Sequence, residues 1–338
     1  MGGQDEQSAR RRFGRVHDYL RISVTDRCNL RCVYCMPPEG LRFEPDHRIL
    51  SCEEIAEIVR VLAPLGVRKL RLTGGEPLVR TDLPRLVSML SAIPGIEDIA
   101  LSTNGILLAP LADELKAAGL KRVNISLDSL RPDRFAAITR GGNLDMVLRG
   151  LNASRRVGFD PIKLNVVLMK GVNDDEVESF LRLTLDEPVH VRFIEYMPIG
   201  HAGTEWKSAY RPLAHVLDTC RRLNWRYAPA GDIYGNGPAD TYRIEGAAGT
   251  FGLIHPVSDH FCGSCNRLRL TADGHIKACL YWSDEFQVRP HIGDAAAIEA
   301  LFRKALDMKP ETHEMARALA GEQLSRTPTA RRMSQIGG

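Results

Sequence analysis

The sequence predicts an α/β fold, namely a partial (β/α)6 TIM-like barrel followed by a smaller C-terminal α+β domain. Two observations support this. Over residues 16–198, short β-branched or apolar runs alternate with segments of helical periodicity, and repeated βα units form a parallel sheet. Polar and glycine-rich residues directly follow the apolar runs, as they do at the functional rim of a barrel. We expect a flexible N-terminal arm at 1–15, the barrel at 16–200 and the second domain at 201–338.

Six runs are predicted to be strands, and the segments between them to be helices. The strand runs cover residues 20–25, 68–73, 98–102, 122–127, 162–168 and 189–195. In the segment after the first loop, Ser51 and Glu54 have the spacing of a capping box. The apolar face of that predicted helix consists of Ile55, Ile58, Val59 and Leu62. The pattern amounts to about six βα units.

The composition is that of an ordinary globular chain, which we expect to be cytoplasmic. Of its 338 residues 44% are hydrophobic and 26% charged, and the net charge of +3 gives no reason to expect a nucleic-acid partner. The N-terminus lacks the apolar segment of a secretory signal, and no apolar run reaches membrane-spanning length. In a reducing compartment the eight cysteines are expected to be metal ligands or buried thiols. We assign Cys52 and Cys220, which lie in predicted helices, to the buried thiols.

Five loops that follow predicted strands carry polar, glycine or sulfur-bearing residues. The first contains Cys28, Cys32 and Cys35 in the pattern C-x3-C-x2-C. The other four read TGGEP (73–77), STNG (102–105), SLDS (126–129) and EYMP (195–198). Because the carboxyl ends of parallel barrel strands lie at one rim, we expect these loops to surround a single site.

Cations recur on one face of three predicted strands. Alternate residues of a strand share a face. This groups Arg21 with Ser23 and Thr25, Lys69 with Arg71 and Thr73, and Lys163 with Asn165 and Val167. A packed barrel interior would carry Val, Ile or Leu at such positions. Solvated edge positions would explain any single cation, but the repetition on three strands favours a lumen that receives an anion.

Three thiolates in one loop suit an iron–sulfur centre better than a structural zinc ion. Thiolates select zinc or iron–sulfur clusters. Structural zinc takes four ligands, commonly in paired C-x2-C units. A four-iron cluster held by three cysteines instead keeps one iron without a protein ligand, open to substrate or cosubstrate. A zinc site completed by a distant His or Cys is the alternative.

With these residues the chain resembles the radical S-adenosylmethionine (SAM) superfamily, whose C-x3-C-x2-C signature the first loop matches. The resemblance implies a [4Fe-4S] cluster whose open iron chelates SAM, and cleavage of SAM to methionine and a 5′-deoxyadenosyl radical. TGGEP resembles the superfamily's GGEP motif, in which glycine lets the backbone approach the methionyl amine. By this resemblance the SAM-contacting residues are Tyr34, at the adenine, and Gly75, Ser126 and Met197.

A second cysteine triad lies in HFCGSCNRLRLTADGHIKACLYW, residues 260–282. Its members, spaced C-x2-C-x13-C, are Cys262, Cys265 and Cys279. The residues between them read as two strands joined by a turn at Asp273 and Gly274, which would return Cys279 toward the first pair. A zinc site with His260 or His275 as fourth ligand fits this spacing about as well.

The two triads, with CNRLRLT after the second pair, make nearly the whole chain similar to the GTP 3′,8-cyclase family of molybdenum-cofactor biosynthesis. The resemblance implies two [4Fe-4S] clusters, SAM, and conversion of GTP to 3′,8-cyclo-7,8-dihydro-GTP after removal of the C3′ hydrogen. The second cluster would bind the guanine edge. The final Gly337 and Gly338 resemble that family's double-glycine tail, which enters the active site. The substrate-binding residues implied are Arg21, Arg71, Ser102, Lys163, Arg267, Leu268 and Arg269.

The same resemblance implies an electron donor such as flavodoxin or ferredoxin, a downstream cyclic pyranopterin monophosphate synthase, and a homodimer. Three other interpretations are compatible with parts of the sequence. A peptide-modifying radical SAM maturase with an auxiliary cluster would have less reason for lumen cations. An electron carrier would not need GGEP or a barrel, and a zinc-stabilised binding protein would be colourless and redox-silent.

Overall fold

The computed structural model describes residues 14–200, 205–231, 237–259 and 261–337. The strands are β1 (Tyr19–Ser23), β2 (Lys69–Thr73), β3 (Asp98–Thr103), β4 (Arg122–Ser126), β5 (Ile162–Leu168), β6 (His190–Glu195), β7 (Tyr227–Pro229), β8 (Asp240–Ile244), β9 (Thr250–Ile254), β10 (Arg267–Leu270), β11 (His275–Lys277) and β12 (Glu285–Gln287). All six predicted strands are confirmed, with ends that differ by at most two residues.

The helices are α1 (Cys52–Leu62), α2 (Leu83–Ser91), α3 (Leu108–Ala117), α4 (Pro132–Thr139), α5 (Leu144–Arg156), α6 (Val177–Asp186), α7 (Glu205–Ala209), α8 (Ala214–Arg222), α9 (Ala295–Asp307), α10 (Met315–Ala320) and α11 (Met333–Ile336). The predicted capping box of α1 is confirmed: Ser51 Oγ accepts from the Glu54 N–H at 3.1 Å, and Glu54 Oε2 accepts from the Ser51 N–H at 2.7 Å. None of the described helices combines the length and the apolar character needed to cross a membrane.

The strands form one curved sheet in the order β12-β11-β10-β1-β2-β3-β4-β5-β6-β9-β8-β7. Strands β1 to β6 are parallel neighbours, as the βα pattern predicts. The strands of the C-terminal region extend this sheet at both edges, with β10 parallel to β1 and β9 parallel to β6. The predicted α/β class with a partial barrel is therefore confirmed, and the added α+β elements continue the barrel sheet.

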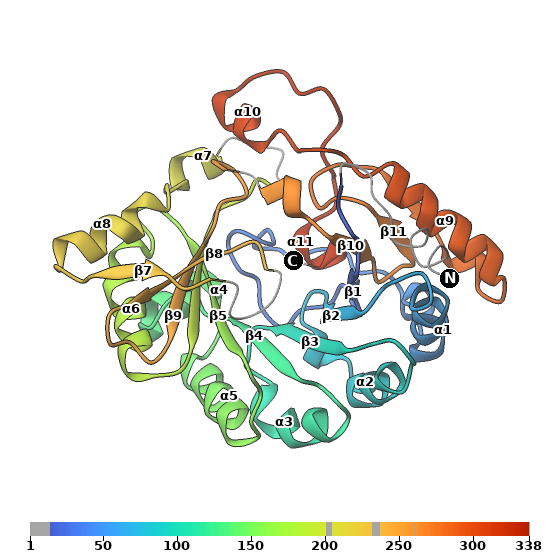
Figure 1. Cartoon of the computed structure of the whole chain (residues 1–338), viewed down its shortest axis with the longest axis horizontal. Helices are drawn as coiled ribbons and strands as arrows, with labels where there is room; N and C mark the ends of the chain where they lie inside the picture. The colour runs from blue at the N-terminus through green and yellow to red at the C-terminus, as the bar shows by residue number, and fades with distance from the viewer. Residues whose placement is uncertain (1–13, 201–204, 232–236, 260, 338) are drawn as a thin grey trace, which may run out of the picture.

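The main hydrophobic core lies between the outer face of the sheet and the helices that cover it (Figure 1). Leu20, Ile22, Leu70 and Leu72 point outward into this core and are fully buried. The predicted apolar face of α1 packs there too, and Cys52 and Cys220 are buried thiols as predicted. Since helices fill the outer side, the inner side is left for the site, and α11 lies within the curve of the sheet (Figure 1).

The predicted N-terminal arm and C-terminal tail are described only in part. Residues 1–13 of the arm lie outside the described residues. Arg15, its last residue, is buried and donates to the carbonyl oxygens of Cys262 at 2.7 Å and Pro310 at 2.9 Å. Gly338, the last residue of the double-glycine tail, also lies outside the described part.

Candidate active site

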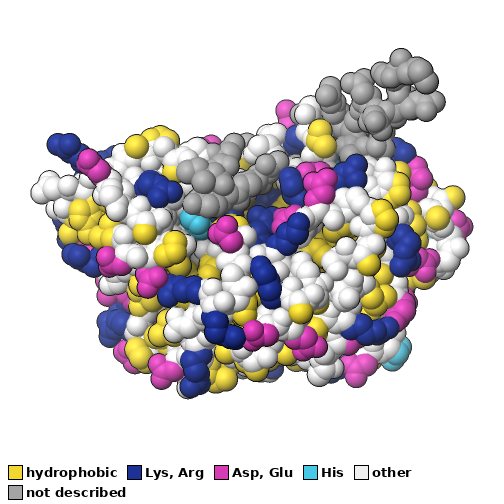
Figure 2. Space-filling view, turned by 60° about the horizontal axis from the view of Figure 1, so that its bottom comes forward, with side chains coloured by type: hydrophobic (Ala, Val, Ile, Leu, Met, Phe, Trp, Pro, Cys, Tyr) yellow, Lys and Arg dark blue, Asp and Glu magenta, His cyan; other side chains and the backbone are white. Residues whose placement is uncertain are grey.

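The inner face of the sheet borders a cavity of about 280 Å³. Eight Lys or Arg side chains and two carboxylates, Glu76 and Asp128, line it. The cations are Arg21, Lys69, Arg71, Arg122, Lys163, Arg192, Arg267 and Arg269. On one outer face, by contrast, positive and negative side chains are interspersed (Figure 2). The cavity is therefore a concentrated positive region in a chain of small net charge.

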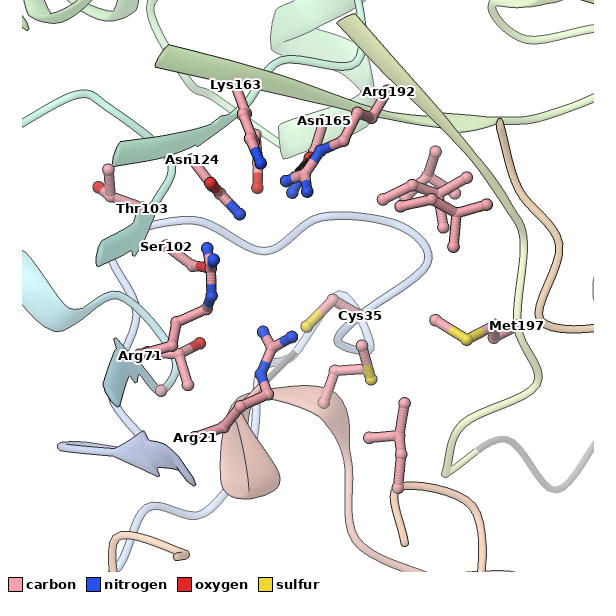
Figure 3. A pocket seen from close by; sticks show the side chains of 18 of the residues that line it. Arg21, Cys35, Arg71, Ser102, Thr103, Asn124, Lys163, Asn165, Arg192 and Met197 are labelled. Carbon is pink, nitrogen blue, oxygen red and sulfur yellow. Dashed lines mark hydrogen bonds between the residues drawn. The ribbon is translucent and has the colours of Figure 1, made fainter. Parts of the chain in front are cut away.

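Strand alternation places the cations in this cavity. Arg71 on β2 and Lys163 on β5 line it, whereas their neighbours Leu72 and Leu164 are fully buried on the helix side. Figure 3 shows Arg71, Lys163 and Arg192 reaching into the same space from three strands. The predicted lumen position of the cations is thus present in the structure, while their role in binding substrate stays a prediction.

Several cavity cations use neutral hydrogen-bond acceptors. Arg71 donates to the hydroxyl of Tyr19 and to Ser102 Oγ, the latter at 3.4 Å. Arg192 donates twice to Asn165 Oδ1, at 2.6 and 2.9 Å. Such contacts orient the guanidinium groups without cancelling their charge. Lys69 and Arg122 are the first residues of β2 and β4. Unlike Arg71 and Arg192, they form ion pairs, Lys69 with Asp18 and Arg122 with Asp98.

The crowding of cations shows in their acid–base behaviour. Burial, together with Arg192, Arg122 and Arg71 nearby, lowers the pKa of Lys163 to about 6. Burial and Arg71 lower the pKa of Arg192 to about 9, and burial and Arg267 lower that of Arg269 to about 10. Each shift means that burial and the neighbouring cations disfavour the positive form. A polyanion bound among these groups would reverse that penalty.

The cysteine loop closes one end of the cavity. Cys28, Cys32 and Cys35 all line it, and Cys35 is seen beside the cavity together with Met197 (Figure 3). The turn is tight, because the N–H of Cys35 donates to the Cys32 carbonyl at 2.9 Å. Burial raises the pKa of the Cys28 thiol to about 11 and that of Cys35 to about 12. Metal binding at these thiols would therefore release protons.

The GGEP glycines fit against the cysteine loop. A Cβ on Gly74 would stand 2.2 Å from the Thr25 carbonyl oxygen, and one on Gly75 would stand 2.2 Å from that of Arg27. The Gly75 N–H donates to the Thr25 carbonyl at 2.8 Å. Both positions thus require glycine because two backbone segments touch there. This is a structural reason additional to the predicted approach of the methionyl amine.

Two buried carboxylates at the cysteine end were not among the predicted site residues. Glu76 accepts from Thr103 Oγ1 at 2.6 Å and from the N–H of Asn104 at 2.6 Å, and burial raises its pKa to about 7. Asp128 accepts from the Tyr34 hydroxyl at 2.6 Å, and burial raises its pKa to about 6. Both stand within loops of the predicted rim, TGGEP and SLDS, so their position in the sequence was a usable signal.

The predicted SAM-contacting residues gather at this end. Tyr34, Gly75, Ser126 and Met197 all line the cavity. Tyr34 is held by its bond to Asp128 and by an edge contact with Tyr196, whose ring centroid is 6.4 Å away. The structure therefore brings these four residues to the cavity that the first triad borders.

The second triad lies near a cation of the cavity, since Arg267 acts electrostatically on the Cys265 thiol. As predicted, β10 and β11 pair antiparallel around the turn at Asp273 and Gly274. The thiol of Cys262 interacts electrostatically with those of Cys265 and Cys279, so the three are close together. Although burial opposes it, Arg267 and Lys309 lower the pKa of Cys265 to about 6.

The donor set of the second triad fits an iron–sulfur cluster. The N–H of Tyr281 points at Cys279 Sγ at 3.4 Å, and such N–H to sulfur bonds tune clusters. Nδ1 of His275, one proposed zinc ligand, contacts Asp273 and Arg331, and His260 lies outside the described residues.

The predicted substrate-binding residues are brought together, with one exception. Those that line the cavity are Arg21, Arg71, Ser102, Lys163, Arg267 and Arg269. Leu268 does not: its side chain is buried in the core on the opposite face of β10, and its part in substrate binding stays a prediction. Two further cavity residues, Arg192 and Asn124, were not predicted from the sequence. The Oδ1 atom of Asn124 is buried and accepts no hydrogen bond from any described residue.

The C-terminal tail enters the same cavity. Met333 and Ser334 of α11 line it, and Arg269 donates to the carbonyl oxygens of Ile336 and Gly337. The tail thus reaches the cavity with Met333 and Ser334, while entry of the double glycine stays a prediction.

Comparisons with known proteins agree with this geometry. The Radical SAM superfamily profile matches residues 22–184, and the profile described as Molybdenum Cofactor Synthesis C matches residues 189–315. A GTP 3′,8-cyclase of Listeria monocytogenes is 60% identical over 97% of this chain and 98% of its own, and one of Lactiplantibacillus plantarum is 53% identical over 96% and 98%.

Among solved structures, Streptococcus suis SuiB bound to S-adenosylmethionine matches 81% of this chain and 63% of its own, with a TM-score of 0.55 at 14% identity. At that identity the match supports the fold alone. The sequence relatives are far more similar and span nearly the whole of both chains. On their evidence this chain belongs to the GTP 3′,8-cyclase family within the radical SAM superfamily.

Proposed function

We propose that the chain converts GTP to (8S)-3′,8-cyclo-7,8-dihydroguanosine 5′-triphosphate, an early step of molybdenum cofactor biosynthesis, beginning with removal of the C3′ hydrogen. The observation that carries this proposal is the excess of eight cations over two carboxylates in a cavity that the first cysteine triad borders. Burying charge without a partner is costly, and a triphosphate offers several oxygens to several guanidinium groups. The relatives named above carry the same activity in their names.

Membership of the superfamily implies a [4Fe-4S] cluster and SAM, and at Cys28, Cys32 and Cys35 they would supply one-electron cleavage of the SAM sulfonium. This chain's own residues orient the reactants. In the proposal, Tyr34 and its cavity neighbours hold SAM at one end, while Arg71 and Lys163 hold the triphosphate at the other. A reactive radical attacks almost any C–H bond, so placement and exclusion of water would provide selectivity.

The second triad, in this proposal, holds another [4Fe-4S] cluster that faces the purine. Arg267 and Arg269 on β10 line the cavity, and Arg267 also acts on Cys265 of that triad, so both arginines would contact the nucleotide. Asn124 lines the same cavity, and its buried Oδ1 offers an acceptor to a ribose hydroxyl or a guanine N–H. A flavodoxin or ferredoxin would donate electrons, a cyclic pyranopterin monophosphate synthase would take the product, and the working unit would be a homodimer.

The test is anaerobic reconstitution with iron and sulfide counts, followed by an assay with GTP, SAM and a reductant. We expect about eight irons per chain and coupled loss of GTP and SAM. Cleavage of SAM without change in GTP would favour another radical SAM reaction such as peptide maturation. Stoichiometric zinc in fully reconstituted protein would contradict the second cluster.

A further inference from the structure

Lys309, just after α9, is a buried cation that joins the two segments of the second triad. Only 3% of its surface is exposed. Its Nζ donates to the carbonyl oxygen of Arg267 at 2.7 Å and to that of Ala278 at 2.8 Å. Arg267 lies two residues after Cys265, and Ala278 directly precedes Cys279. One ammonium group therefore fixes the distance between the chain segments that carry two of the three thiols.

The two hydrogen-bond acceptors of Lys309 are neutral carbonyl groups. Burial lowers the pKa of Lys309, while the nearby sulfurs of Cys265 and Cys279 favour its charged form. Lys277 provides a contrast within the same hairpin. It is fully buried and donates to the carbonyl of Trp282 at 3.1 Å, but the carboxylate of Glu285 lies 3.2 Å from its Nζ. A carboxylate thus pairs with one buried lysine, whereas the printed hydrogen bonds of the other go to carbonyl oxygens.

The segment that precedes β1 adds to the positive surroundings. Arg15 donates to the Cys262 carbonyl at 2.7 Å and to that of Pro310, the residue after Lys309. His17 is 1% exposed, and neither ring nitrogen has a hydrogen-bond partner among the described residues. Burial, Lys309 and Arg15 lower the pKa of His17 to about 3, so it stays neutral. Two cations, Arg15 and Lys309, therefore bind carbonyl groups of the segments that carry the triad.

A cluster bound by three thiolates would supply negative charge to balance these cations. A [4Fe-4S] unit in its oxidised form carries two positive charges, so three thiolates leave it with a net negative charge, and reduction adds another. A buried cation nearby favours the more negative state, because Coulomb interactions are strong where water is excluded.

We propose that Lys309 is a positioning residue for the second cluster, which it holds by joining the segments of Cys265 and Cys279 and whose reduced form its charge stabilises. The inference rests on the second cluster of the proposed function. It assigns to a residue outside the cavity a measurable influence on cluster retention and on reduction potential.

The test isolates the second cluster in the full chain. Replacing Cys28, Cys32 and Cys35 by Ala leaves the second triad alone, and its midpoint potential is followed by EPR during an anaerobic redox titration. In this background we compare Lys309→Met, Lys309→Gln and Lys309→Arg. We expect the neutral variants to shift the midpoint to more negative potential and to retain less iron, and Lys309→Arg to stay close to the parent.

A matched control removes a buried lysine without changing net charge. Lys277→Met combined with Glu285→Gln should lower the denaturation midpoint but leave the reduction potential nearly unchanged. If Lys309→Met retains no iron, the midpoint reduction potential is measured on Lys309→Gln. If both neutral variants lose the cluster and Lys309→Arg keeps it, the role of charge is supported, whereas equal loss in all three would assign the effect to shape and overturn the proposal.

The outcome separates this inference from the function on which it rests. Wild-type protein with about eight irons, combined with identical potentials in the parent and the neutral Lys309 variants, would overturn the role of Lys309 and leave the proposed function intact. Wild-type protein with about four irons would remove the second cluster itself.

Discussion

Gly337 lies directly against Thr73: a Cβ at position 337 would stand 2.4 Å from Thr73 Cγ2. The φ of Gly337 is +72°, a region that favours glycine, and its carbonyl accepts a hydrogen bond from Arg269. The end of the chain is therefore held between β2 and β10 by its own backbone. A residue with a side chain does not fit at this position without moving the tail or the strand.

Gly337→Ala is expected to displace the tail from the cavity. Gly171→Ala is a matched control, because Gly171 has φ +70° but no described atom within 4 Å of the point that a Cβ would occupy. Both substitutions carry the conformational penalty of an L-residue at positive φ, of order 1–3 kcal/mol. Only Gly337→Ala should speed carboxypeptidase digestion and lower GTP conversion. Equal digestion rates for the two variants would show that the contact with Thr73 does not hold the tail.

Substitutions on the two faces of β2 and β5 should have different effects. Arg71→Ala and Lys163→Ala should weaken GTP binding, each by roughly 1.5–3 kcal/mol for a charge-assisted contact. Leu72→Ala and Leu164→Ala should lower the free energy of unfolding by about 2–5 kcal/mol, since both side chains are fully buried. Equilibrium GTP affinity and a denaturation midpoint, measured on all four variants, check this. If neither Arg71→Ala nor Lys163→Ala changes the GTP affinity, the triphosphate binds elsewhere.

GTP binding should consume a proton at Lys163. Burial and neighbouring cations lower the pKa of Lys163 to about 6 in the free protein, so at a pH well above that value it is mostly neutral. A bound triphosphate would raise this pKa, and between the two pKa values binding takes up a proton. Affinity should therefore fall as pH rises above about 6. Calorimetry at one pH in buffers of different ionisation enthalpy measures the uptake.

Lys163→Met is the control for that measurement, because protons released or bound by the nucleotide itself are common to both proteins. The difference in proton uptake between wild type and Lys163→Met should be positive. A difference of zero would mean that Lys163 does not change protonation on binding.

The two cysteine triads should differ in what their loss abolishes. Replacing Cys28, Cys32 or Cys35 by Ala should end formation of 5′-deoxyadenosine from SAM, since these thiols border the predicted SAM residues. Replacing the triad of Cys262 should spare some uncoupled SAM cleavage but stop GTP cyclisation. Product analysis by chromatography under anaerobic, reducing conditions distinguishes the two. Complete loss of SAM cleavage in both sets, with the first cluster intact, would contradict this division.

The fold was predictable wherever the signal is local. The alternation of β-branched runs and capped amphipathic helices specifies β1 to β6, and Ser51 with Glu54 marks the start of α1 through contacts three residues apart. How the C-terminal strands attach was not predictable in the same way. Tyr19 pairs opposite Arg267, and no feature within either segment specifies a partner so far along the chain.

In the candidate site, too, residues with a local sequence signal could be predicted and residues that depend on distant contacts could not. Strand parity located Arg71 and Lys163 because each shares its face with further polar residues in a short run. Arg192 sits between Val191 and Phe193, which are buried on the helix side, and the same parity rule applied to β6 would have found it. Lys309 could not be found this way, because its role depends on two carbonyl groups of a distant hairpin and not on any residue pattern around it.

The pairing of β1 with β10 makes the order of synthesis matter. β1, the first strand in the sequence, pairs with β10, one of the last. Cys28 of the first triad follows β1, and Cys265 of the second triad precedes β10. On the ribosome, β1 has an unpaired edge until residues beyond 270 emerge, and such an edge recruits strands from other molecules. A chain that stops short of β10 is therefore expected to aggregate through β1 rather than to yield a smaller working barrel.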